Sequence, residues 1–209
     1  MNTITARLLF FPVFFVLLMV AMTVHEFAHG WTAYRLGDQT AKSSGRLTLN
    51  PFAHIDLYWT LLLPLLFFLS SGFFIAAAKP VPINYWVLKN PKRDIMWIGL
   101  SGPLANFICA VFLSLLIRLI PFNSILRPLI GNLIYINIVL GVFNLIPIPP
   151  LDGSRVLMGM LPERLSSGYA KLEPYGFLII LALFLFGNFG RALFPAILTI
   201  TYLLRGVPL

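Results

Sequence analysis

Residues 25 to 29 read His-Glu-Phe-Ala-His, a pattern that combines metal-binding side chains with a proton acceptor. On a helix each residue advances by about 100°, so His25 and His29 lie about 40° apart with Glu26 beside them. Two imidazoles on one face can hold one zinc ion, and the adjacent carboxylate can take a proton from water at the metal. The pattern therefore predicts metal-assisted hydrolysis.

A simpler interpretation of this motif is a polar cluster beyond the membrane edge, where the side chains bond only to solvent. The preceding residues argue against it, because Leu8 to Val24 contains no charge and only one polar residue. Ionisable groups within a membrane helix are costly and mark functional sites. The chain also holds only three histidines and three glutamates, so a chance match would be rare.

A catalytic zinc site normally has three protein ligands and an open position, so a third ligand is needed. Asp152 is the best candidate, because it closes an uncharged stretch and follows Pro147-Ile148-Pro149-Pro150, which must break a helix. Broken backbone at membrane depth is tolerated where it lines a cavity. Asp152 could equally be a turn residue or a helix N-cap, since Asp-Gly is a common turn dipeptide. The other candidates near membrane edges are His54, Asp56, Asp94 and Glu163.

The composition places the chain in a membrane. It has 209 residues, of which 59% are hydrophobic and 11% charged, which is too apolar for a soluble globular protein. The net charge of +8 does not indicate nucleic acid, because the basic residues fall in short loops beside hydrophobic stretches and orient the chain in the bilayer. The single cysteine, Cys109, lies in an apolar stretch and forms no intramolecular disulfide.

Apolar stretches define the expected helices, and the N-terminal one is expected to remain as a permanent span. A stretch of 23 residues without charge, 95–117, is long enough to cross a hydrocarbon core of about 30 Å. The prolines at 79–84 force that segment to be extended. The two short stretches of the tail are expected to be tilted or partial helices. The apolar stretches are residues 5–36, 57–78, 95–117, 128–151, 175–186 and 192–204.

A shared metal restricts the topology. The histidines end the first span and Asp152 ends the 128–151 stretch, so both spans must run in the same direction. An odd number of crossings must then lie between them. Residues 95–117 supply one, so the 57–78 stretch cannot cross singly and is expected to dip into the membrane and return. Most basic residues then fall on one side, which is predicted to be cytosolic. These are Arg35, Lys42, Arg46, Lys79, Lys89, Lys92, Arg93, Arg155, Arg164 and Lys171, whereas Arg7, Arg118 and Arg127 lie opposite.

Three other features have more than one interpretation. Asn137 and Asn144 lie on nearly the same helix face, and Asn144 could hold a substrate carbonyl or oxyanion, or join helices by hydrogen bonds. His54 could be a gate residue, a polar group near the metal or a loop histidine, with the last favoured. The 79–84 segment could pair with a substrate by strand addition or could be a plain proline loop.

Four motifs of this chain occur together in one known family. They are His-Glu-Phe-Ala-His at 25–29, Asn-Pro-Phe-Ala-His-Ile-Asp at 50–56, Gly-Pro-Leu-Ala-Asn at 102–106 and Asn-Leu-Ile-Pro-Ile-Pro-Pro-Leu-Asp-Gly at 144–153. With these motifs, residues 20–155 resemble the site-2 protease family of intramembrane zinc metalloproteases, in its compact bacterial branch. The resemblance implies that His25, His29 and Asp152 bind one zinc ion. It also implies that Glu26 is the base and that Asn144 helps position the scissile peptide.

The chain departs from the family pattern in one place. After Asp56 the branch usually has Pro-x-Gly-Thr, whereas Leu57-Tyr58-Trp59-Thr60 stands here, so the geometry of this turn is not predicted. The PDZ or CBS modules of some relatives are not expected.

The expected fold is an all-α polytopic membrane protein with a three-helix catalytic core, a re-entrant segment and a C-terminal helical pair. Residues 1–209 are expected to form one integral membrane protease domain, with the core at about 5–155 and the C-terminal helices at about 169–206. The expected site lies near the cytosolic face of a bacterial cytoplasmic membrane.

The expected activity is hydrolysis of peptide bonds within or near transmembrane segments, for regulated proteolysis or clearance of signal-peptide remnants. Its partners would be the bilayer and a transmembrane substrate, with no nucleic acid. The alternative is a non-catalytic membrane protein such as a metal carrier, channel or binding partner. An intact Glu26 argues against a degenerate protease, and no repeated halves typical of transporters are visible.

Overall fold

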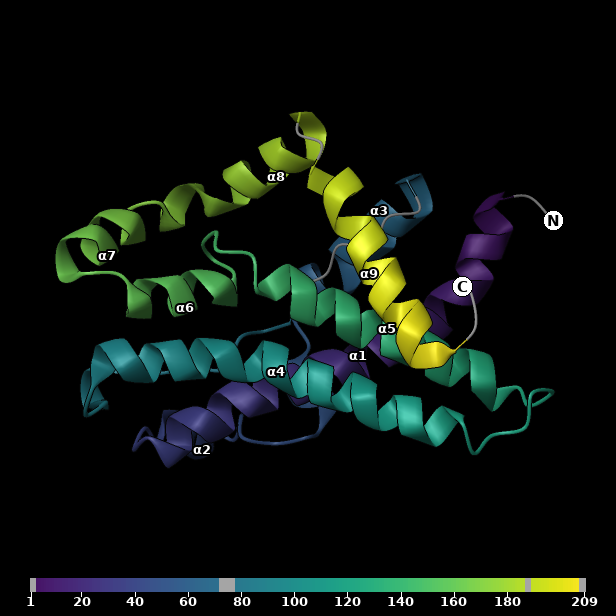
Figure 1. Cartoon of the computed structure of the whole chain (residues 1–209), viewed down its shortest axis with the longest axis horizontal. Coiled ribbons are helices and arrows are strands. Elements are labelled where there is room, and N and C mark those ends of the chain that lie inside the picture. The colour runs from purple at the N-terminus through teal and green to yellow at the C-terminus, as the bar shows by residue number, and fades with distance from the viewer. Residues whose placement is uncertain (1–2, 72–77, 187–188, 207–209) are drawn as a thin grey trace.

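Three long helices form the centre of the molecule (Figure 1). The computed structural model describes residues 3–71, 78–186 and 189–206, and every regular element in these ranges is a helix. The helices α1 (Thr3–Arg35), α4 (Pro91–Ile117) and α5 (Leu126–Asn144) contain the three stretches long and apolar enough to cross a membrane. They pack against one another in all three pairings. The predicted all-α polytopic membrane fold with a three-helix core is confirmed.

The directions of these helices agree with the predicted topology. In Figure 1, α1 and α5 run the same way and α4 runs against them, with the loop between α4 and α5 at the right. The 27 residues of α4 extend about 40 Å at 1.5 Å per residue, which exceeds a hydrocarbon core of about 30 Å. The C-terminal end of α1 and that of α5 therefore lie towards the same end of the bundle.

The apolar stretch after Asp56 returns to its starting point. It begins with the π-helical turn η2 (Leu57–Leu62) and continues as α3 (Leu63–Ser71), and residues 72–77 lie outside the described ranges. The Lys79 amide donates a hydrogen bond to the His54 carbonyl at 3.0 Å, which joins the two ends of the stretch. This course is the one predicted for a re-entrant segment.

The turn at the departure from the family pattern is held by a side chain. The Asp56 carboxylate accepts hydrogen bonds from the amides of Tyr58 and Trp59, each at 3.0 Å. Asp56 thus satisfies backbone donors at the start of the helix, as an N-cap residue does, without the proline and glycine of the usual pattern.

The proline-rich run breaks the chain between α5 and α6 (Asp152–Met160), as predicted. The backbone of α6 lies so close to the end of α5 that only glycine fits at 153, since a Cβ there would lie only 2.2 Å from the Leu145 carbonyl oxygen. The helix α6 can therefore start directly against the end of α5 and then pack along α4. Helix α6 itself was not predicted. It places Asp152 in the first turn of a new helix rather than at the end of the preceding span.

The C-terminal part supplies the predicted helical pair, α8 (Gly176–Phe186) and α9 (Phe189–Arg205). Helix α9 packs against α5 and α4, and its Ile197 is buried with Ile134 and Ile138. A second apolar cluster joins Leu18 and Met22 to α5. The remaining short elements are α2 (Thr40–Ser43), η1 (Pro51–His54), η3 (Tyr85–Val87), α7 (Glu163–Ala170) and η4 (Glu173–Tyr175).

Candidate metal site

Three side chains from α1 and α6 converge in the core beside α4. The Nε2 atoms of His25 and His29 lie 3.1 Å apart, and Oδ2 of Asp152 lies 3.0 Å from the first and 3.2 Å from the second. All three residues are at least nine-tenths buried. The structure therefore brings together the three residues that the sequence predicted as metal ligands.

The hydrogen bonds on the far side of each imidazole leave both Nε2 atoms as acceptors. Nδ1 of His29 lies 2.6 Å from the Ile98 carbonyl oxygen, which can only accept, so this nitrogen carries the proton. Nδ1 of His25 lies 2.6 Å from Oδ1 of Asn106, which is also an acceptor. With both rings neutral, three lone pairs face one another, an arrangement that a bound cation would stabilise. The donor set fits a metal.

The size of the triangle fits zinc. Zinc binds nitrogen and oxygen at about 2.0–2.1 Å with tetrahedral geometry, which separates two ligand atoms by about 3.3 Å. The three observed separations of 3.0, 3.1 and 3.2 Å are close to this value. His25, His29 and Asp152 could therefore hold one zinc ion with only small movements.

Helix α4 approaches the imidazoles through Gly102. A Cβ at this position would lie 2.4 Å from Nε2 of His29 and 2.7 Å from Cε1 of His25. Contacts this short between a Cβ and a ring are not found in proteins, so any other residue would displace the histidines. Glycine at 102 is thus a steric requirement of the site.

Asp152 does not act as a cap. Helix α6 has no side-chain cap bond at its start, and the Asp152 carboxylate points to the two imidazoles instead. An ionised carboxylate is the form that binds a metal.

Glu26 is held from the opposite side by the extended segment. Its Oε2 accepts a hydrogen bond from the Val81 amide at 2.9 Å, and among the described residues no donor reaches its other oxygen. The sequence did not predict this contact. It fixes the carboxylate next to the histidines on α1 while leaving one oxygen free to accept a proton.

The same segment is anchored at both ends. Arg46 donates to the Lys79 carbonyl oxygen at 2.6 Å, and the Asn84 amide donates to Oδ2 of Asp38 at 2.8 Å. Asp38 is fully buried and follows the end of α1. Residues 79–84 form no helix, in agreement with the prolines, Asn84 has an extended backbone, and the segment is tied to α1 and its flanking loop.

Two predicted residues lie apart from the triangle. The Asn144 amide donates to the Leu140 carbonyl oxygen of its own helix at 3.0 Å and contacts none of the three ligand atoms. His54 is fully buried, with Nε2 bonded to the Thr48 carbonyl at 3.0 Å and Nδ1 without a partner. His54 thus lies in the short turn η1, outside the group of three potential ligands, and its role stays a prediction.

The remaining ligand candidates are used elsewhere. Asp94 accepts from the Asn90 amide at the start of α4. Asp56 caps η2, and Glu163 is exposed on α7. Among the described residues, the one group of three potential ligands is His25, His29 and Asp152.

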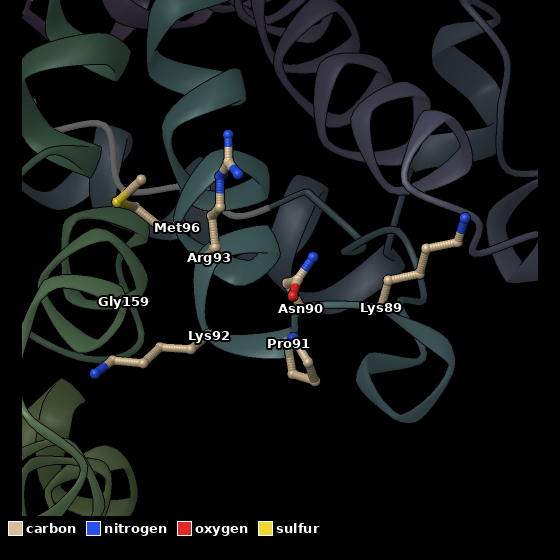
Figure 2. A pocket seen from close by; sticks show the side chains of 7 residues that line it. All are labelled: Lys89, Asn90, Pro91, Lys92, Arg93, Met96 and Gly159. Atoms are coloured by element: carbon tan, nitrogen blue, oxygen red, sulfur yellow. The ribbon is translucent and has the colours of Figure 1, made fainter.

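A surface hollow of about 430 Å³ lies at the start of α4, away from this group. It is lined in part by Lys89, Lys92 and Arg93 and by no residue of the triangle. Figure 2 shows these three cationic side chains pointing away from one another, so they do not focus on one ligand. The hollow is not the candidate site.

Two histidines of a helix long and apolar enough to cross a membrane converge with an aspartate of α6 in a buried group, an arrangement typical of membrane-embedded metal-dependent enzymes. The model of peptidase family M50 matches residues 13–131 and 122–187. The chain belongs to this family, the site-2 proteases, and is a zinc metalloprotease. Membership argues against the non-catalytic alternative.

Individual relatives are also named as zinc metalloproteases. The candidate zinc metalloprotease YwhC of Bacillus subtilis is 37% identical over 182 residues, which cover 83% of this chain and 80% of the relative. The candidate zinc metalloprotease Rip2 of Mycobacterium tuberculosis is 31% identical over 169 residues, which cover 80% of this chain and 64% of the relative. The chain thus spans less than two thirds of the mycobacterial protein. No solved structure matches the chain significantly.

The steric role of Gly102 gives a direct prediction. Gly102→Ala should reduce zinc binding at least about tenfold, because the new methyl group displaces both imidazoles. The matched control is Gly168→Ala, where a Cβ meets no atom within 4 Å. Zinc affinity of the purified variants, measured by competition with a chromophoric chelator, checks this. Equal zinc affinity in Gly102→Ala and wild type would contradict the described geometry.

Proposed function

We propose that this protein cleaves peptide bonds within or near transmembrane segments, with His25, His29 and Asp152 as zinc ligands and Glu26 as the base. The observation that carries the proposal is the convergence of three acceptor atoms within 3.2 Å, between helices apolar enough to span a membrane. A hydrolytic site at this depth can reach substrates that soluble proteases cannot.

The residues of the chain supply binding and proton transfer. When bound, zinc would act as a Lewis acid that lowers the pKa of water and polarises a peptide carbonyl. The free oxygen of Glu26 accepts a proton as a water oxygen attacks the carbonyl carbon. When the carbon–nitrogen bond breaks, Glu26 returns that proton to the leaving amine. The Val81 amide keeps the carboxylate oriented throughout.

A transmembrane substrate must unwind before attack, because a helical peptide bond is shielded by its own turn. The extended 79–84 segment is a suitable guide, since its backbone is anchored by Arg46 and Asp38 and it bonds directly to Glu26. An unwound peptide could add to it as a strand. Asn144 would contribute by turning its amide from Leu140 towards the substrate carbonyl.

We further propose that residues 1–209 form one protease domain and that the site faces the cytosol of a bacterial cytoplasmic membrane. The support is the distribution of charge. Lys89, Lys92 and Arg93 lie at the start of α4, towards the end of the bundle that carries the metal triangle, whereas Arg118 and Arg127 lie at the opposite end. Basic residues accumulate on the cytosolic side of membrane proteins.

Glu26→Gln should abolish proteolysis while preserving the fold and zinc. Loss of a general base typically lowers rates by about 10²–10⁴-fold, and glutamine keeps the shape of the side chain. Mass spectrometry of protein termini in membranes expressing each variant should find new termini within or near transmembrane segments for wild type only. Glu163→Gln, which changes an exposed glutamate, is the matched control and should match wild type. New termini that persist in Glu26→Gln, or that occur only in soluble proteins, would contradict the proposal.

The orientation is tested by a cysteine at Asn84, with Cys109 replaced by alanine so that one thiol remains. Residue 84 ends the extended segment and should face the cytosol. A membrane-impermeant thiol reagent is expected to label it in inverted vesicles and not in intact cells. Labelling only from outside intact cells would overturn the orientation.

A further inference from the structure

A fully buried pair of asparagines lies behind the metal triangle. Asn106 on α4 and Asn137 on α5 each have no exposed surface. Both lie in apolar helices, where a polar side chain is costly unless its hydrogen bonds are satisfied. The pair forms a continuous chain of hydrogen bonds that ends at His25.

Both amide nitrogens of the pair donate hydrogen bonds. Nδ2 of Asn106 donates to Oδ1 of Asn137 at 2.8 Å and to the Ala21 carbonyl oxygen at 3.2 Å. Nδ2 of Asn137 donates to the Leu133 carbonyl oxygen at 2.8 Å, which turns its oxygen towards Asn106. Both hydrogens of the Asn106 amide are therefore used, and only its oxygen remains to face His25.

We propose that Asn137 is a positioning residue for zinc, acting through Asn106 on the tautomer of His25. Asn137 itself touches neither the metal triangle nor a substrate. Its oxygen opposes rotation of the Asn106 amide, since a rotated amide would place one oxygen against another. The inference rests on the proposed zinc site, because it assigns a role to the atom that His25 presents there.

The chemical consequence follows from the two nitrogens of one imidazole. While Oδ1 of Asn106 faces Nδ1 of His25, that nitrogen carries the proton and Nε2 keeps its lone pair for the metal. A rotated amide would present an N–H donor to Nδ1. The proton would then move to Nε2, and that atom could no longer bind zinc. Asn137, on α5, thus favours the metal-binding tautomer of His25, on α1.

The test uses the purified full chain with two measurements, zinc affinity by chelator competition and ¹⁵N NMR of labelled histidine rings without zinc. The chain has only three histidines, so the ring signals can be assigned by single substitutions. Asn137→Leu, nearly equal in volume, should weaken zinc binding by about 10–100-fold, as is typical when a residue supporting a metal ligand is lost. The His25 signal should shift towards the Nε2-protonated tautomer. Asn132→Leu, on an exposed site of α5, should change neither measurement.

Two further variants separate this role from a purely structural one. Asn137→Asp keeps an acceptor for Asn106 and should retain the wild-type tautomer and, within a few-fold, the zinc affinity. In an Asn106→Leu background, adding Asn137→Leu should cause no further loss, because the relay is already broken. An unchanged His25 tautomer in folded Asn137→Leu, an additive loss in the double variant, or loss of the wild-type tautomer in folded Asn137→Asp would each overturn the inference.

These outcomes are distinct from failure of the proposed site. If wild type bound zinc equally well after His25→Ala, the metal site itself would be wrong. If zinc binding needed His25 but was unaffected by Asn137→Leu, only the relay would be wrong.

Discussion

The site depends on three potential ligand atoms, Nε2 of His25, Nε2 of His29 and Oδ2 of Asp152, which lie within 3.2 Å of one another in the core. With both imidazoles neutral, these atoms present only lone pairs to one another, and a cation bound between them would turn their repulsion into attraction. Two glycines in the neighbouring helices make this arrangement sterically possible. Gly102 lets α4 approach the rings, and Gly153 lets α6 begin where Asp152 can reach them.

A shell of polar contacts from α4, α5 and the extended segment fixes the reactive atoms. The Ile98 carbonyl and Asn106 set the two imidazoles, and the Val81 amide sets Glu26. Such contacts are strong in a low-dielectric interior and costly to break. The site is therefore preorganised by backbone and amide groups rather than by further charges, which would be expensive at this depth.

The sequence predicted most of what has a periodic or compositional signal. The His-Glu-x-x-His spacing predicted that His25 and His29 share one helix face. The uncharged stretches predicted the membrane-spanning helices, and the prolines before Asp152 predicted the end of the helix that precedes it. It did not predict α6, because a nine-residue helix that packs on α4 has no long apolar pattern. It also missed the burial of His54, which depends on a re-entrant fold that brings Lys79 back to it. Contacts between Glu26 and a backbone amide have no sequence signal.

The most direct test of this account is the zinc content per chain of the purified full-length protein, measured by mass spectrometry of the metal. Wild type should contain about one zinc ion, and Asp152→Ala should lose most of it, because two imidazoles alone make an incomplete site. Glu163→Ala, at an exposed position, should keep the wild-type content. Equal zinc in Asp152→Ala and wild type, or no zinc in folded wild type supplied with the metal, would contradict the three-residue site.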